Sequence, residues 1–147
     1  MPEGYDVQID PEGSFDIDDN WELIEGISVK EEAVVERTYP GKYKKILVVL
    51  YSEDKIPRMR LKGDNYQYWE FYSYSNYQYQ NMFVFGEIVA PNIFSNVYAT
   101  AGNAGGSANL YLPIIERFKN TATYFNGFKT DSACKKGTAI RVYGVKA

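Results

Sequence analysis

The feature that most limits how this chain can fold is a two-residue alternation of side chains within short segments. Residues Arg58–Lys62 alternate basic and apolar side chains, which is typical of a strand with one buried face. Residues Lys44–Ser52 contain a continuous apolar run, which is typical of a strand buried on both faces. No window repeats apolar residues at helical spacing, and the best candidate, Glu31–Arg37, contains the β-branched pair Val34-Val35. The pattern therefore predicts an all-β protein.

Turn-forming residues separate about nine or ten such segments, which favours an antiparallel sandwich or barrel. We expect a jelly-roll-like antiparallel β-sandwich over residues 21–147, preceded by an extended arm over residues 1–20. Pro40-Gly41 predicts a turn, and Asn126-Gly127 predicts a two-residue hairpin loop. The expected strands are Trp21–Glu25, Ile27–Tyr39, Lys44–Ser52, Arg58–Lys62, Tyr66–Ser75, Tyr77–Ala90, Ile93–Thr100, Ala108–Glu116, Arg117–Phe125 and Thr138–Lys146.

Charge separates the arm from the rest of the chain. Residues 1–20 contain seven acids and no Lys or Arg, so the remainder has 12 of the 19 acids against all 16 bases. An acidic arm before a mildly basic domain indicates a docking segment that adds as an edge strand to a partner's sheet. A disordered acidic tail is an equally good interpretation. The apolar residues of the expected anchoring arm are Tyr5, Val7, Ile9, Phe15 and Ile17.

Composition excludes several classes of function. The chain has no His and one Cys, Cys134, which excludes a Ser-His-Asp triad, an intrachain disulfide and a metal site built from His or Cys. We therefore expect no enzyme, no cofactor and no metal. No dense Lys or Arg run indicates a nucleic-acid partner. The opening residues lack the pattern of a signal peptide, and the run Ile46–Tyr51 is too short to cross a bilayer, so we expect no export signal and no membrane insertion.

Tyrosine dominates the aromatic residues, with 14 copies, and residues 66–79 are especially rich in it. Because side chains alternate faces along a strand, we expect Trp69 and Phe71 to face the core and the tyrosines to face outward. Such a row fits a cross-strand ladder, a subunit interface or a platform for glycans. The residues of this tyrosine ribbon are Tyr66, Tyr68, Tyr72, Tyr74, Tyr77 and Tyr79.

Two residues suggest catalysis. Glu70 lies among the tyrosines, and aromatic surroundings raise a carboxyl pKa, so a carbohydrate-active enzyme that uses Glu70 with a second carboxylate is an alternative from another class. A solvated charge that limits aggregation of a sheet edge is the simpler interpretation. Cys134 precedes Lys135-Lys136, which favours a thiolate, but the chain has no His to act as its base. A structural cysteine is therefore the better interpretation.

Three short motifs resemble a group of small structural proteins of tailed phages and prophages. The motifs are Trp21–Glu25, Tyr43–Leu50 and Ala139–Lys146. Members of that group often open a β domain with a Trp-Glu-Leu-Leu stretch and close it with an Ile-Tyr-Gly-Ile-Lys tail. The likeness covers residues 21–147 in outline and only the motif positions in detail. The tyrosine-rich centre departs from it, and Lys135-Lys136-Gly137 stands where the group often has a small apolar residue or Pro.

The resemblance implies a virion protein, assembled in the host cytoplasm as a fibre, baseplate or head-appendage subunit and commonly homotrimeric. It also implies that residues 1–20 dock on a capsid or tail protein while the β domain faces the host. Weak contacts with host glycans would then gain strength from the several copies on one particle. A capsid decoration or joining protein without a receptor role is the alternative within the same class.

Overall fold

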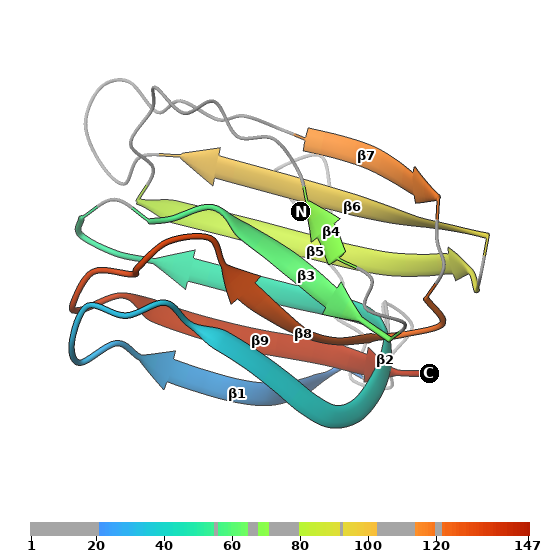
Figure 1. Cartoon of the computed structure of the whole chain (residues 1–147), viewed down its shortest axis with the longest axis horizontal. Coiled ribbons are helices and arrows are strands. Elements are labelled where there is room, and N and C mark those ends of the chain that lie inside the picture. The colour runs from blue at the N-terminus through green and yellow to red at the C-terminus, as the bar shows by residue number, and fades with distance from the viewer. Residues whose placement is uncertain are drawn as a thin grey trace, which may run out of the picture.

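The computed structural model describes residues 21–54, 56–64, 68–70, 80–91, 93–102, 114–119 and 122–147. Every regular element in this part of the chain is a β-strand, and all pairings between strands are antiparallel (Figure 1). The prediction of an all-β antiparallel protein is therefore confirmed. The strands are β1 (Glu22–Ser28), β2 (Glu36–Tyr51), β3 (Met59–Gly63), β4 (Tyr68–Glu70), β5 (Asn81–Ala90), β6 (Phe94–Gly102), β7 (Ile114–Lys119), β8 (Phe125–Thr130) and β9 (Ala139–Lys146).

The strands form an open sheet in which β2 is the central element. The order is β4-β3-β8-β2-β5-β6-β7, and β9 pairs with both β2 and β1. The first part of β2 pairs with β8, and its second part lies between β5 and β9. Figure 1 shows β3 and β8 in front of β2 and β5. We call β4, β3, β8 and the first part of β2 the small layer. We call β1, β9, the second part of β2, β5, β6 and β7 the large layer.

The core lies between these two layers. Ile46 and Leu50 of β2 are fully buried, and the residues between such positions are partly exposed. At Gly86 of β5, an added Cβ would lie 2.7 Å from both Leu61 Cδ1 of β3 and Phe125 Cζ of β8. Cβ atoms do not pack that closely, so this glycine allows the two layers to approach each other.

Trp69 of β4 joins the two layers at one side of the core. Its ring is fully buried, with its centroid 4.5 Å from that of Phe125. Its Nε1 donates a hydrogen bond of 2.5 Å to Oγ of Ser95, a buried residue of β6. The indole N–H and the serine hydroxyl therefore satisfy each other inside the core. The prediction that Trp69 faces the core is confirmed, and Phe71 lies outside the described residues.

The turn predicted at Pro40-Gly41 does not separate two strands, because both residues lie inside β2. β2 itself bends sharply and turns back between its two parts (Figure 1). The register of β2 with β8 shifts between Thr38 and Tyr43, so the pair marks the irregularity at which β2 passes from one layer to the other. A proline is tolerated at such a point because a local break in the ladder needs no N–H donor.

The hairpin loop predicted at Asn126-Gly127 is also wrong, because β8 runs through both residues. The backbone oxygen of Arg37 occupies the space that a Cβ at Gly127 would need. Glycine is needed at this position because β8 and β2 approach each other closely there, and not because the backbone forms a left-handed turn. Among the described glycines, the left-handed φ belongs to Gly137, at 91°.

Three other expectations can be compared with the structure. The alternation at Arg58–Lys62 is confirmed, since β3 buries every second residue. The closing strand expected at Thr138–Lys146 is confirmed as β9. The weak helix candidate Glu31–Arg37 is not helical, and Ala33 instead forms an isolated β-bridge with Cys134.

Candidate functional site

Most of the predicted binding residues lie outside the part of the chain that the structure describes. This holds for the arm residues Tyr5, Val7, Ile9, Phe15 and Ile17 and for Tyr66, Tyr72, Tyr74, Tyr77 and Tyr79 of the ribbon. The backbone of Tyr68 is described in β4, where it pairs with Lys62 of β3. The candidate sites considered below are therefore built from other residues.

The outward side of the large layer carries a continuous apolar row. Cross-strand register places Tyr143 between Leu23 and Leu47, and Phe85 between Leu47 and Tyr98. Cross-strand partners share one side of a sheet, so these five side chains form one row across five strands. The next row adds Val49 and Phe83. We call this surface the outer face, formed by Leu23, Lys45, Leu47, Val49, Phe83, Phe85, Glu87, Tyr98, Arg141 and Tyr143.

Several of these apolar side chains are well exposed. The exposed fraction is 58% for Leu23 and 42% for Phe83, and Leu47 and Val49 are partly exposed. The prediction that Lys44–Ser52 is buried on both faces is therefore wrong for its outward residues. Exposed apolar side chains are ordinary one at a time, but a connected group on a flat sheet marks a contact surface.

Trp21 already lies on the outer face. Its ring centroid is 5.9 Å from that of Phe85, and Phe85 in turn lies 5.7 Å from Tyr98. Both ring pairs are tilted, at 46° and 41°. These distances and angles are those of favourable aromatic contacts. The Trp21 indole therefore covers part of β5, which is not a neighbour of β1 in the sheet.

A pocket of about 600 Å³ opens beside the end of β2. Its lining combines an exposed aromatic ring, two carboxylates and an ammonium group. Gln80 holds its rim, because its Nε2 donates to the backbone oxygen of Glu53 at 2.9 Å and its own backbone oxygen accepts from Ser52 N at 2.8 Å. The lining residues are Tyr51, Ser52, Glu53, Asp54, Lys136 and Gly137.

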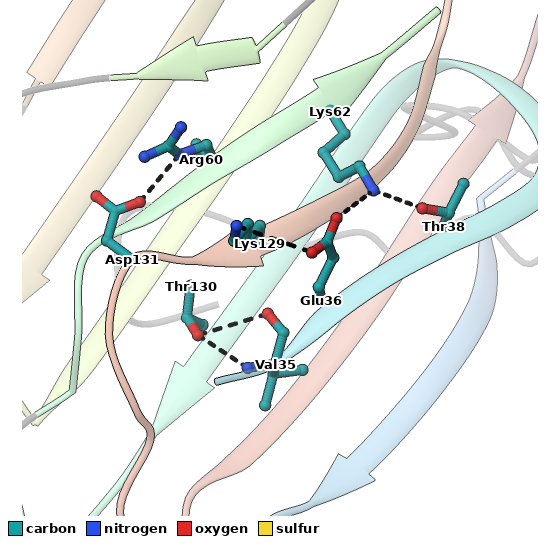
Figure 2. A network of polar contacts seen from close by, with 8 residues as sticks. All are labelled: Val35, Glu36, Thr38, Arg60, Lys62, Lys129, Thr130 and Asp131. Carbon is teal, nitrogen blue, oxygen red and sulfur yellow. Dashed lines mark hydrogen bonds and ion pairs between the residues drawn. The ribbon is translucent and has the colours of Figure 1, made fainter. Parts of the chain in front are cut away.

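The outward side of the small layer is charged, and its charges are paired with one another (Figure 2). Lys62 Nζ lies 3.0 Å from Glu36 Oε1 and donates to Thr38 Oγ1 at 2.5 Å. Arg60 Nε lies 2.9 Å from Asp131 Oδ1. Hydrogen bonding from Lys62 and its charge hold the pKa of Glu36 below its ordinary value. We call this surface the charged face, formed by Glu36, Thr38, Arg60, Lys62, Lys129 and Asp131.

Another ion pair links β1 to the first part of β2. Arg37 Nη2 lies 2.8 Å from Glu25 Oε1, and its Nε donates to Oε2 at 3.0 Å. Partial burial acts to raise the pKa of Glu25, but the hydrogen bond and the positive charge of Arg37 outweigh it and lower that pKa. The two-pronged geometry fits a structural clamp between strands.

Asp64, at the end of β3, binds the start of the next described segment. Its Oδ1 accepts from the backbone N–H groups of Thr123 and Tyr124 at 2.6 and 3.2 Å, and its Oδ2 accepts from the Thr123 hydroxyl at 2.8 Å. Partial burial acts to raise the pKa of Asp64, yet these hydrogen bonds outweigh it and lower that pKa. Because all its oxygens are engaged in fixing a loop, Asp64 is a structural carboxylate.

The described residues offer little for catalysis. Cys134 is fully buried, and burial raises the pKa of its thiol, which disfavours the thiolate. The backbone of Glu70 pairs with Arg60 in β3. Among the described residues, no group of three or more Cys, Asp or Glu side chains gathers where a metal ion would bind, and no helix is long and apolar enough to span a membrane.

Comparisons with family models, with curated proteins and with solved structures give no match. The three motifs named above therefore carry the phage resemblance without further support from related proteins.

Sequence reasoning missed both the outer face and the pocket, although signals for the outer face were present. Asn81, Phe83 and Phe85 share parity in one strand, which indicates one common face. The apolar run of β2 also contains enough large side chains to cover two faces. The pocket had no such signal, because Lys136 and Glu53 are brought together by tertiary structure alone.

Proposed function

We propose that this chain is a non-catalytic structural subunit of a tailed-phage or prophage particle, a fibre, baseplate or head-appendage component that forms homo-oligomers, most simply trimers. One observation carries the proposal. The three motifs of the resemblance fall in or beside strands β1, β2 and β9, which are adjacent in the sheet. Segments far apart in the sequence thus build one framework, which supports treating the three motifs as one structural unit.

The proposal includes the finer fold and the docking role of the arm. The two layers, joined by the bent strand β2, support a sandwich of the jelly-roll-like type. Residues 1–20 are proposed to anchor the subunit on a capsid or tail protein, with the β domain directed toward the host.

Particle purification tests this function. Particles released from a lysed producing culture are separated on a density gradient and probed with an antibody against the full chain. We expect the protein to co-sediment with particles at a fixed ratio to the major capsid protein. A protein found only in the soluble fractions would contradict the proposal. The same antibody, imaged on the particles by electron microscopy, shows where the protein lies. Antibody bound at the particle exterior supports host contact, and antibody bound at a neck or interior position supports the joining-protein alternative.

The proposal further includes contact with host glycans, and the pocket beside β2 supports it. Tyr51 is 46% exposed, and exposed tyrosine rings pack against the C–H faces of sugars. The carboxylates of Glu53 and Asp54 and the ammonium group of Lys136 line the same pocket and can bond to sugar hydroxyls. This combination fits a short neutral or amino-bearing oligosaccharide.

Two surfaces could bind a glycan, the pocket beside β2 and the tyrosine ribbon. Calorimetric titration of the protein and its variants with purified host surface polysaccharide distinguishes between them. We expect Tyr51→Ala to weaken binding by about ten-fold, the equivalent of roughly 1.4 kcal/mol. Phe83→Ala is the matched control, since Phe83 has similar exposure at 42% and does not line the pocket. Binding that survives Tyr51→Ala but is lost in Tyr68→Ala and Tyr72→Ala would assign the glycan to the tyrosine ribbon instead.

A further inference from the structure

The outer face has the composition of a surface that something covers. Strand β2 places large apolar side chains on both of its sides, as strands buried on both faces do. Its inward residues are buried by the small layer. Its outward residues Leu47 and Val49 remain partly exposed among the described residues. The sequence of β2 therefore indicates a second cover on the outer face.

The contact between Trp21 and Phe85 shows that the chain just before β1 already lies over the outer face. The strands β9 and β2 lie between β1 and β5, so β5 is three strand spacings, about 14 Å, from β1. An indole does not span that distance from a backbone position in line with β1. The backbone at residue 21 has therefore already turned over the outer face when it meets Phe85. The chain that precedes Trp21 starts from this position.

We propose that residues 1–20 of the same chain dock on the outer face while the subunit is free, a position that they leave when they anchor the subunit to a particle. Twenty residues in extended form reach roughly 66 Å, whereas the five-strand row is about 19 Å wide. The segment supplies apolar side chains for the row, including Phe15 and Ile17. Its seven acids meet a remainder of the chain that carries a net charge of +4, from 16 bases and 12 acids. The outer face itself carries two bases, Lys45 and Arg141, against one acid, Glu87.

A second copy of the chain fits the outer face less well. The centre of the apolar row is Phe85 with its neighbours, and Trp21 already lies against that ring. A flat sheet from another copy would have to displace the indole before the two faces could meet. The arm needs no such displacement, because Trp21 is its continuation.

Site-specific photocross-linking in the full-length chain tests the proposal. Phe83 on the outer face is replaced by p-benzoylphenylalanine, and the control chain carries the same replacement at Ser132, an exposed loop residue after β8. We expect the probe at position 83 to cross-link within the monomer to peptides from residues 1–20, and the probe at position 132 not to do so. Cross-links from position 83 that join two copies, or that reach only residues 21–147, would overturn the proposal.

Proteolysis provides an independent readout. Residues 1–20 contain Glu3 and Glu12 and no Lys or Arg, so a Glu-specific protease reports on their accessibility. We expect Phe83→Asp to speed cleavage after Glu12 by about five-fold or more, because the new charge repels the acidic arm. Ser132→Asp adds the same charge elsewhere and should leave the rate unchanged. Equal rates in the two variants, with unchanged circular dichroism, would count against docking.

Discussion

The charged face and the outer face both point to solvent, yet they are built on opposite plans. On the charged face, acids and bases from β2, β3, β8 and the residue after β8 form ion pairs with one another. On the outer face, apolar side chains run across five strands, with Lys45, Arg141 and Glu87 among them. A face whose charged side chains pair with one another is stable in contact with water and does not need to be covered. A sheet side with a connected apolar row gains free energy when it is covered.

The difference locates stability and docking in different parts of one small domain. Stability arises mainly between the two layers of the sheet, where both layers bury their inward side chains. The charged face contributes little, because exposed ion pairs are worth little. The outer face is the proposed docking surface for residues 1–20, so removing its side chains should alter that docking more than the folding of the layers.

Phe125→Ala should give the largest loss of stability. Phe125 is fully buried and contacts both Trp69 and the position of Gly86, so its removal leaves a cavity between the layers. We expect the free energy of unfolding to fall by about 3 to 5 kcal/mol in urea denaturation. The matched change on the outer face, Phe83→Ala, should cost less than about 1.5 kcal/mol. Similar costs for the two would refute the assignment of stability to the core.

Ser95→Ala should have the next largest effect. The change removes the acceptor for the buried Trp69 Nε1–H and leaves that donor without a partner in the core. We expect a loss of about 1 to 3 kcal/mol, measured by thermal and urea unfolding. Ser132→Ala, at an exposed position, should be neutral. A neutral Ser95→Ala would mean that the hydrogen bond does not hold β4 to the large layer.

Asp64→Asn should remove a pH dependence of stability at the border of the small layer. The folded-state pKa of Asp64 lies below its ordinary value of 3.8, so its contribution is present above that value and is lost as the pH falls through the lower folded pKa. We expect about 1 to 2 kcal/mol of destabilisation at pH 7 and a convergence of the two proteins at acid pH. Parallel stability curves from pH 7 to 2 would show that the hydrogen bonds do not favour the carboxylate.

Lys62→Met should have the smallest effect, and salt should remove it. The change breaks the contacts of the ammonium group with Glu36 and Thr38 on the charged face. Because the Glu36 pKa is lowered by Lys62, the difference between the proteins should be present near neutral pH and vanish once Glu36 is protonated. The difference in stability is measured from the urea midpoints of both proteins in low salt and in 1 M salt. At 1 M salt the Debye length is roughly 3 Å, so exposed ion pairs are largely screened. A large, salt-independent loss would show that the charged face does more than solvate the sheet.

Local alternation predicted the parts of the fold that depend on burial alone. The strands at Arg58–Lys62 and Thr138–Lys146 and the inward orientation of Trp69 follow from two-residue periodicity, and the structure has them. The same reasoning gave no account of which strands pair. The neighbours of β2 depend on contacts between distant residues, and no short window of sequence contains them.

The two turn predictions failed for a related reason. Proline and glycine at residues 40–41 and Asn-Gly at residues 126–127 are turn residues by local preference. In the folded chain, Gly127 instead makes room for the carbonyl of Arg37, and Pro40 lies where the ladder of β2 is interrupted. A glycine needed for close approach looks the same in sequence as one needed for a turn. The pocket beside Tyr51 could not be predicted from local sequence either, because its lining residues come from two segments that are far apart in the chain.

The pairing of β1 with β9 has a consequence for how the protein is made. The earliest strand of the described chain finds its hydrogen-bonding partner in the latest one. During synthesis, β1 and one edge of β2 must remain without their strand partner until β9 has left the ribosome. Pairing between residues so far apart in sequence is expected to form slowly. A nascent chain that stalls before the eight-residue strand β9 would carry two open sheet edges, which invite aggregation.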